Sequence, residues 1–147
     1  MNKKIGISTG CMAGLGFTNE QAIKLIKKSG IQTTEVFIQA RIEMTSARIY
    51  ELRKVIRNSG VHVNSIHPFM EGYEVPNLFS EMEDKFYDGL EYFYRYLEIS
   101  NLLGNKYLIM HGPLPTVGYE AAIRRLRLLI RMAADLSIGK EKCLNNH

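Results

Sequence analysis

Short apolar runs alternate with longer amphipathic stretches along the whole of this 147-residue chain. The runs near residues 4–8, 33–39, 62–67 and 106–111 are rich in β-branched and other apolar residues, a composition that predicts strands. An amphipathic stretch with helical periodicity follows each run. Because parallel strands need long crossover connections, this alternation predicts an α/β fold with a parallel sheet.

Start and stop signals divide the chain in the same way. Thr18 with Gln21, and Ser80 with Glu83, have the spacing of a capping box, in which two side chains satisfy N–H groups of the first helical turn. Glycine favours the left-handed backbone that often ends a helix. The glycines that should end the first, second and fourth helices are Gly30, Gly60 and Gly139. The predicted helices cover residues 18–30, 46–60, 80–103 and 119–138.

Composition and charge limit the number of domains, the partners and the location that we expect. With 46% hydrophobic and 23% charged residues, residues 1–147 are predicted to form a single domain. A net charge of +4 without a long basic run makes a nucleic-acid partner unlikely, and no apolar run is long enough for a signal peptide or membrane span. Cys11 and Cys143 lie far apart without metal-type spacing, which favours a reducing compartment, and the cytoplasm is the expected location.

Four strand–helix units are half of a larger closed architecture. A complete (β/α)8 barrel, or TIM barrel, needs roughly 250 residues, so the predicted fold is a partial (β/α)8 barrel with about four βα units. Such a half barrel leaves two sheet edges without partners and an apolar interior without cover. We therefore expect a homo-oligomer or a complementing half barrel.

Two histidines lie at the carboxyl ends of predicted strands, where the functional residues of barrels are found. His67 ends the third predicted strand in the segment SIHPF (65–69), and His111 ends the fourth in YLIMHGP (107–113). Functional side chains of parallel folds gather at the carboxyl ends of strands, and neutral imidazole is a common metal ligand. The pair thus predicts part of a site for a divalent metal (Zn, Mn or Mg), although two ligands are too few for a stable catalytic metal, and a structural role is the alternative.

These segments, together with EVFI (35–38) and IGIS (5–8), resemble the xylose-isomerase-like barrel superfamily. The superfamily contains sugar-phosphate isomerases and epimerases and endonuclease-IV-like nucleases that act at abasic sites. The resemblance covers nearly all of the chain and implies the N-terminal half of such a barrel. It also implies metal-assisted isomerisation of a sugar or sugar phosphate, in which the metal polarises a hydroxyl and a carbonyl while a base moves a proton.

The resemblance leaves three functions open. In the isomerase and epimerase branch, it implies metal ligands on strands five to eight and substrate-facing histidines on earlier strands, so this chain alone could be inactive. In the nuclease branch, it implies that His67 and His111 bind zinc, but the modest charge does not support a DNA-binding face. The third alternative is a non-enzymatic half barrel that acts as an assembly partner. The catalytic residues stay unknown.

The end of the chain departs from the pattern of the superfamily. The segment KCLNNH (142–147) resembles the start of a fifth strand, in which a Leu-Glu-Asn-like motif would supply a metal-binding Glu. Asn145 stands at that position, and a neutral amide is a weaker ligand for a divalent cation than a carboxylate.

Other features of the sequence have ordinary structural explanations. Glycines 10, 14 and 16 lack the spacing of a phosphate-binding loop. The aromatic residues of the third helix are expected in the core and at its boundary, and the arginines of the fourth helix on a solvated outer face. Those arginines are Arg124, Arg125, Arg127 and Arg131. His62 begins a strand, away from the expected site, and should be structural.

Overall fold

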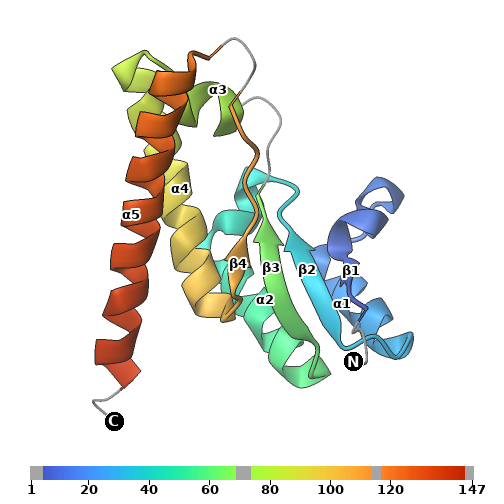
Figure 1. The fold of residues 1–147 in the computed structure, drawn as a ribbon. Coiled ribbons are helices and arrows are strands. Elements are labelled where there is room, and N and C mark those ends of the chain that lie inside the picture. Colours follow the sequence, from blue (N-terminus) through green and yellow to red (C-terminus); the bar gives the residue numbers. More distant parts are fainter. Residues whose placement is uncertain (1–4, 69–73, 114–116, 145–147) are drawn as a thin grey trace. The chain divides into compact units, whose positions relative to one another are not determined.

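A computed structural model of the protein describes residues 5–68, 74–113 and 117–144. Four strands alternate with helices along the chain (Figure 1). The chain divides into two compact units, one made of residues 1–69 and 98–110 and the other of residues 70–97 and 111–147. All four strands lie in the first unit. The prediction of a single domain over residues 1–147 stays a prediction.

The strands form one sheet in the order β1-β2-β3-β4, and every neighbouring pair is parallel. This confirms the predicted α/β fold. Strands β2 and β3 are the long central ones, whereas β1 and β4 contain two residues each and are shorter than predicted. Their bounds are β1 Ile7–Ser8, β2 Thr33–Phe37, β3 His62–His67 and β4 Tyr107–Leu108. The β2–β3 register shifts between Thr34, which pairs with Val63, and Glu35, which pairs with Ser65.

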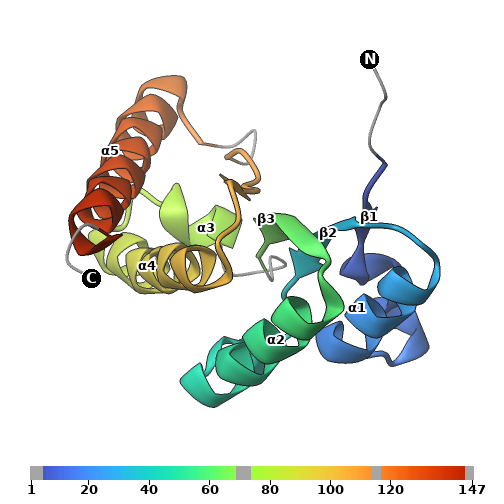
Figure 2. The same ribbon diagram turned by 90° about the horizontal axis from the view of Figure 1, so that it is seen from below.

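Helices α1 (Asn19–Lys28) and α2 (Ser46–Ser59) lie side by side on one face of the sheet (Figure 2). The apolar core of this unit lies between the helices and the sheet. Its members with at most 4% exposure include Ala22, Ile23, Ile26, Val36, Ile49, Leu52 and Ile66. The capping box of Thr18 and Gln21 is confirmed, and Gly60 ends α2 with φ 68°.

Two short 3-10 helices follow the first two strands. Helix η1 (Thr9–Leu15) starts directly after β1, where the Ser8 hydroxyl accepts a hydrogen bond from the N–H of Gly10. Helix η2 (Arg41–Met44) lies between β2 and α2. Both therefore lie at the carboxyl end of the sheet, the end where functional side chains collect in parallel folds.

The second unit contains α3 (Glu74–Leu78), most of α4 (Glu83–Leu103) and α5 (Tyr119–Leu144). Helix α3 lies between the third predicted strand and the third predicted helix, in a segment for which neither a strand nor a helix was predicted. It packs closely on α4, because a Cβ atom on Gly89 would lie 3.0 Å from the backbone nitrogen of Leu78. The aromatic residues of α4 follow the prediction only in part: Phe86, Phe93 and Tyr96 are buried, whereas Tyr87 and Tyr94 are exposed.

The prediction that the arginines of α5 lie on a solvated face is wrong for Arg125, whose side chain is 16% exposed. Its guanidinium lies 3.6 Å from the centroid of the Phe86 ring, donates two hydrogen bonds to the carbonyl of Ser80 and forms a 2.7 Å ion pair with Glu83. The capping box predicted for Ser80 and Glu83 is also wrong. Helix α4 begins at Glu83, and the Ser80 hydroxyl accepts from the N–H of Met82.

The predicted start of a fifth strand is wrong for residues 142–144, because α5 continues to Leu144. Gly139, predicted as a helix stop, lies inside that helix. Glycine costs about 1 kcal/mol relative to alanine in a helix interior, and the lysines and glutamate that follow it are good helix formers, so the helix can extend through it. Asn145, which stands where the resemblance implies a metal-binding Glu, lies outside the described residues.

In the part of the chain that is described, no helix is long and apolar enough to cross a membrane.

Candidate functional site

The two faces of the sheet differ in chemistry at its carboxyl end. Val36 and Ile66 are fully buried on the face that α1 and α2 cover. Side chains alternate between faces along a strand, so the residues on either side of Val36 lie on the opposite face. There Glu35 pairs in register with Ser65, and Phe37 with His67. We call this set of Glu35, Phe37, Ser65 and His67 the site face.

The four side chains of the site face form two contacts across β2 and β3. The Ser65 hydroxyl donates a 3.3 Å hydrogen bond to Oε2 of Glu35. One step further along the strands, the rings of Phe37 and His67 stack with their centroids 5.0 Å apart and 28° between their planes. A carboxylate, a hydroxyl, an imidazole and an aromatic ring are therefore grouped near the carboxyl ends of two neighbouring strands.

A hollow of about 1010 Å³ adjoins the polar part of the site face and extends toward the amino ends of the strands. Its polar side chains include Ser8, Thr33, Glu35, His62, Asn64 and Ser65. These hydroxyl, amide, imidazole and carboxylate groups can both donate and accept hydrogen bonds. The hollow is therefore suited chemically to a polar ligand rich in hydroxyl groups.

The backbone of Phe37 is held by two buried side chains from other elements. Its N–H donates to Oγ1 of Thr9 at 2.9 Å, and its carbonyl accepts from Nδ2 of Asn19 at 2.9 Å. Thr9 is fully buried and Asn19 is 2% exposed. The tip of β2 is thus tied to both η1 and α1.

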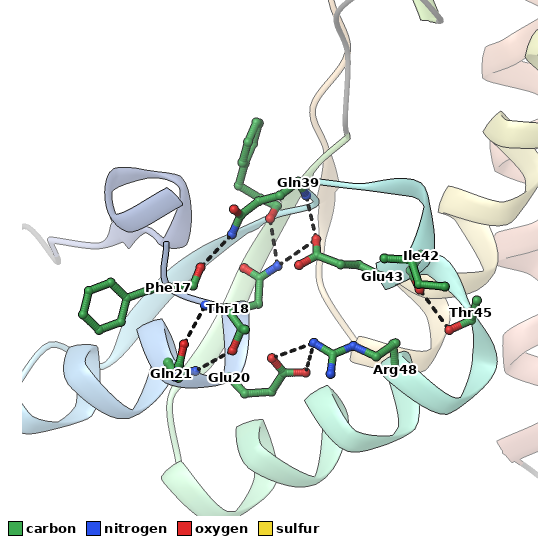
Figure 3. Close-up of polar contacts among 11 residues, drawn as sticks. Phe17, Thr18, Glu20, Gln21, Gln39, Ile42, Glu43, Thr45 and Arg48 are labelled. Atoms are coloured by element: carbon green, nitrogen blue, oxygen red, sulfur yellow. Dashed lines mark hydrogen bonds and ion pairs between the residues drawn. The ribbon is translucent and has the colours of Figure 1, made fainter. Parts of the chain in front are cut away.

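A carboxylate after β2 extends these contacts (Figure 3). Oε2 of Glu43 accepts a 2.6 Å hydrogen bond from the backbone N–H of Gln39 and a 3.4 Å hydrogen bond from Nδ2 of Asn19. The Gln39 amide in turn donates to the carbonyl of Phe17. These bonds connect the segments that follow β1 and β2.

The structure places the predicted site residues in different units. His67 ends β3 in the first unit and stacks on Phe37, whereas His111 is an exposed residue that follows β4 and belongs to the second unit. That they share one pocket stays a prediction. His62 is exposed at the amino end of β3, away from the tip of that strand, in agreement with its predicted position.

Sequence reasoning missed the residues that surround His67. Glu35 was recognisable in principle, because a charged residue inside an apolar predicted strand has to point away from the core. Phe37, Thr9 and Asn19 carried no such signal. Their roles depend on contacts between residues 18 to 30 positions apart in the sequence.

Among the described residues, no three His, Cys, Asp or Glu side chains are grouped so that they could hold a metal ion. Catalytic metal sites usually have three protein ligands. The described residues thus do not form the predicted metal site by themselves, and metal ligation by His67 and His111 stays a prediction.

The sequence matches no protein-family model and no curated protein. Solved structures do match. A xylose isomerase domain protein from Planctomyces limnophilus aligns over 90% of this chain with a TM-score of 0.66 and 16% identity. The chain has the fold of half a xylose-isomerase-like barrel. Two epimerase structures agree: a 3-keto-D-glucoside 4-epimerase from E. coli (TM-score 0.65, 20% identity, 92% of this chain) and a D-allulose 3-epimerase from Methylomonas sp. (0.65, 15%, 90%).

This half-barrel chain covers 51%, 54% and 48% of the lengths of those three structures. It therefore spans about half of each, which fits the predicted N-terminal half of a barrel. At these identities the similarity establishes the fold, and the function has to be argued from the site face.

Proposed function

We propose that the site face recognises a sugar at the carboxyl ends of β2 and β3, as one half of a barrel of the sugar isomerase or epimerase type. The observation that carries the proposal is the grouping of the four side chains on the site face: Phe37 stacks on His67, and Glu35 and Ser65 also line a polar hollow. The fold supports it, because matching structures include sugar epimerases, one of them solved in complex with D-allulose.

The site-face residues offer a sugar complementary contacts. The imidazole of His67 can donate or accept a hydrogen bond with a hydroxyl group, and the carboxylate of Glu35 can accept one. The ring of Phe37 presents an apolar surface to C–H groups. The proposal concerns recognition of the sugar; the carboxylates that would move its proton are implied by the family resemblance on strands five to eight. If a divalent metal takes part, His67 and His111 are the ligands this chain would offer.

Titration of D-allulose, followed by NMR on the purified chain, tests this proposal. We expect saturable shifts of backbone signals near residues 35–38 and 65–68, lost or strongly weakened in His67→Ala and weakened in Glu35→Gln. Glu51→Gln is the matched control for Glu35→Gln, because it neutralises an exposed carboxylate of α2 that does not line the hollow, and it should bind like the parent. Absence of saturable binding in the parent, or equal binding by His67→Ala, would contradict the proposal.

The abasic-site nuclease is tested separately. Incubation of the chain with zinc and a duplex that contains an abasic site should leave the duplex intact. Cleavage that disappears in His67→Ala would instead establish the nuclease alternative.

The proposal includes a complementing half. Strands β1 and β4 are the edges of the described sheet, so each has one side without a strand partner there. Four further parallel strands, from a second copy or from another polypeptide segment, would close an eight-stranded barrel. The purified chain should therefore self-associate or bind a hydrophobic dye. Sedimentation analysis together with dye fluorescence tests this; a monomer that binds no dye and unfolds cooperatively would count against it.

A further inference from the structure

We infer that Thr9 and Asn19 are positioning residues for His67, which they control by clamping the backbone of Phe37. The clamp itself is a structural inference, and its importance for ligand binding rests on the proposed function. Thr9 and Asn19 act through the aromatic ring that stacks on the imidazole.

The first contact of the clamp, from the N–H of Phe37 to Thr9, lies where β1 has ended and can no longer pair with β2. The last β1–β2 pair joins Ser8 to Glu35, and the chain then turns into η1. The N–H of Phe37 lies two residues beyond that pair, where β1 no longer runs alongside. A buried N–H without a partner is costly, and the hydroxyl of Thr9 supplies the acceptor at 2.9 Å. A side chain thus continues the pairing that the backbone of β1 has ended.

The second contact of the clamp is made to the backbone carbonyl of Phe37. Asn19, in the first turn of α1, donates to the Phe37 carbonyl, and Glu43 accepts from the same amide nitrogen. The amide oxygen of Asn19 is buried and has no hydrogen-bond partner among the described residues. Leaving such an oxygen unpaired costs stability. The Asn19 amide is therefore oriented for the hydrogen bonds that its nitrogen donates, one of which goes to the Phe37 carbonyl at the tip of β2.

The clamp reaches His67 through two contacts. The stacked ring of Phe37 limits the orientation of the imidazole, and the N–H of Ile38 donates a 2.9 Å hydrogen bond to the carbonyl of His67. Both contacts come from residues at or next to the clamped position. Loosening the backbone of Phe37 should thus move the imidazole even though β3 itself is unchanged.

Imidazole C–H signals in NMR report this directly, because a stacked ring displaces them. The His67 signals are assigned by their loss in His67→Gln. Thr9→Val removes the acceptor at nearly constant shape, and Thr9→Ser keeps it. We expect Thr9→Val to move the His67 signals toward their positions in Phe37→Leu, while Thr9→Ser stays close to the parent.

Ile23→Val is the control for general destabilisation, since Ile23 is fully buried on α1 and takes no part in the clamp. It should lower the melting temperature and leave the His67 signals in place. Glu43→Gln supplies a second variant if Thr9→Val does not fold, and it should move the His67 signals in the same direction through Asn19. Unmoved signals in the folded clamp variants, or an equal movement in Ile23→Val, would overturn the inference.

The two proposals can fail separately. Thr9→Val should weaken D-allulose binding several-fold relative to Ile23→Val if both are correct. If the parent binds no sugar, the proposed function fails, and the imidazole signals still decide whether the clamp exists. If sugar binding is unaffected while the signals move, the clamp is confirmed as a positioning device that this ligand does not use.

Discussion

Each unit of the molecule contains an arginine that joins two helices, and the two arginines differ in their surroundings. In the first unit, Arg48 of α2 lies 3.2 Å from the carboxylate of Glu20 on α1, and its side chain is 42% exposed. In the second unit, Arg125 of α5 is 16% exposed and contacts a carboxylate, a backbone carbonyl and the face of Phe86. Arg48 forms a surface ion pair, whereas Arg125 is part of the packing between α4 and α5.

The difference follows from what lies beneath each helix pair. Helices α1 and α2 rest on a sheet, and their contact side is filled by aliphatic residues such as Ile23 and Ile49. Among the described residues of the second unit there is no strand, so its helices are held by contacts with one another. We therefore expect the arginine that joins two helices to contribute little to stability in the first unit and more in the second.

The largest expected effects come from one core residue in each unit. Ile49→Ala and Leu129→Ala each remove a side chain that is 1% exposed and should each cost about 2–5 kcal/mol of unfolding free energy. Urea unfolding, followed by circular dichroism and by tyrosine fluorescence, measures this. If residues 1–147 form one domain, both variants shift a single transition. Two transitions, each shifted by one variant, would contradict the single-domain prediction.

Arg125→Ala should have the next largest effect, about 1–3 kcal/mol, because it leaves the Ser80 carbonyl and the Phe86 ring without their partner. Arg125→Lys is the matched control. It keeps the charge but loses the planar group that donates to Ser80 while stacking on Phe86, so it should recover only part of the stability. Full recovery by lysine would show that charge alone matters at this position.

Two of the three glycines predicted as helix stops, Gly60 and Gly139, should respond to substitution in opposite directions. Gly60 ends α2 with φ 68°, a backbone conformation that costs an alanine about 1–2 kcal/mol, so Gly60→Ala should lower the melting temperature. Gly139 lies inside α5, where Gly139→Ala should stabilise by about 0.5–1 kcal/mol on backbone grounds. Destabilisation by both substitutions would argue against the helical conformation of residue 139.

The smallest effect is expected for Arg48→Ala, within about 1 kcal/mol, as for other exposed ion pairs. Thermal unfolding at low and high salt should show that little of the parent's stability depends on this pair. A loss equal to that of Arg125→Ala would remove the contrast between the two units.

Local patterns predicted the first unit well, because its elements depend on signals close in sequence. Thr18 with Gln21 marked the start of α1, and Gly60 marked the end of α2. The second unit was harder to predict. Ser80 and Glu83 have the spacing of a cap, but Arg125, 45 and 42 positions away, binds the carbonyl of one and the carboxylate of the other.

The candidate site was predictable only in part. The position of His67 at a strand end followed from the apolar run before it and the proline after it. Its partner Phe37, and the clamp of Thr9 and Asn19, depend on how β2 lies against β1, β3 and α1. No periodicity within one segment contains that information.

The irregular register between β2 and β3 determines which way His67 points. Asn64 is the additional residue in β3, because Thr34 pairs with Val63 and Glu35 already pairs with Ser65. In an uninterrupted ladder His67 would stand opposite Ile38, which is fully buried, and its imidazole would face the helices. One inserted residue thus brings the imidazole to the polar side of the sheet, and its deletion would reverse the two faces at the tip of β3. A change in chain length of a single amino acid could therefore create or abolish this site without altering any side chain in it.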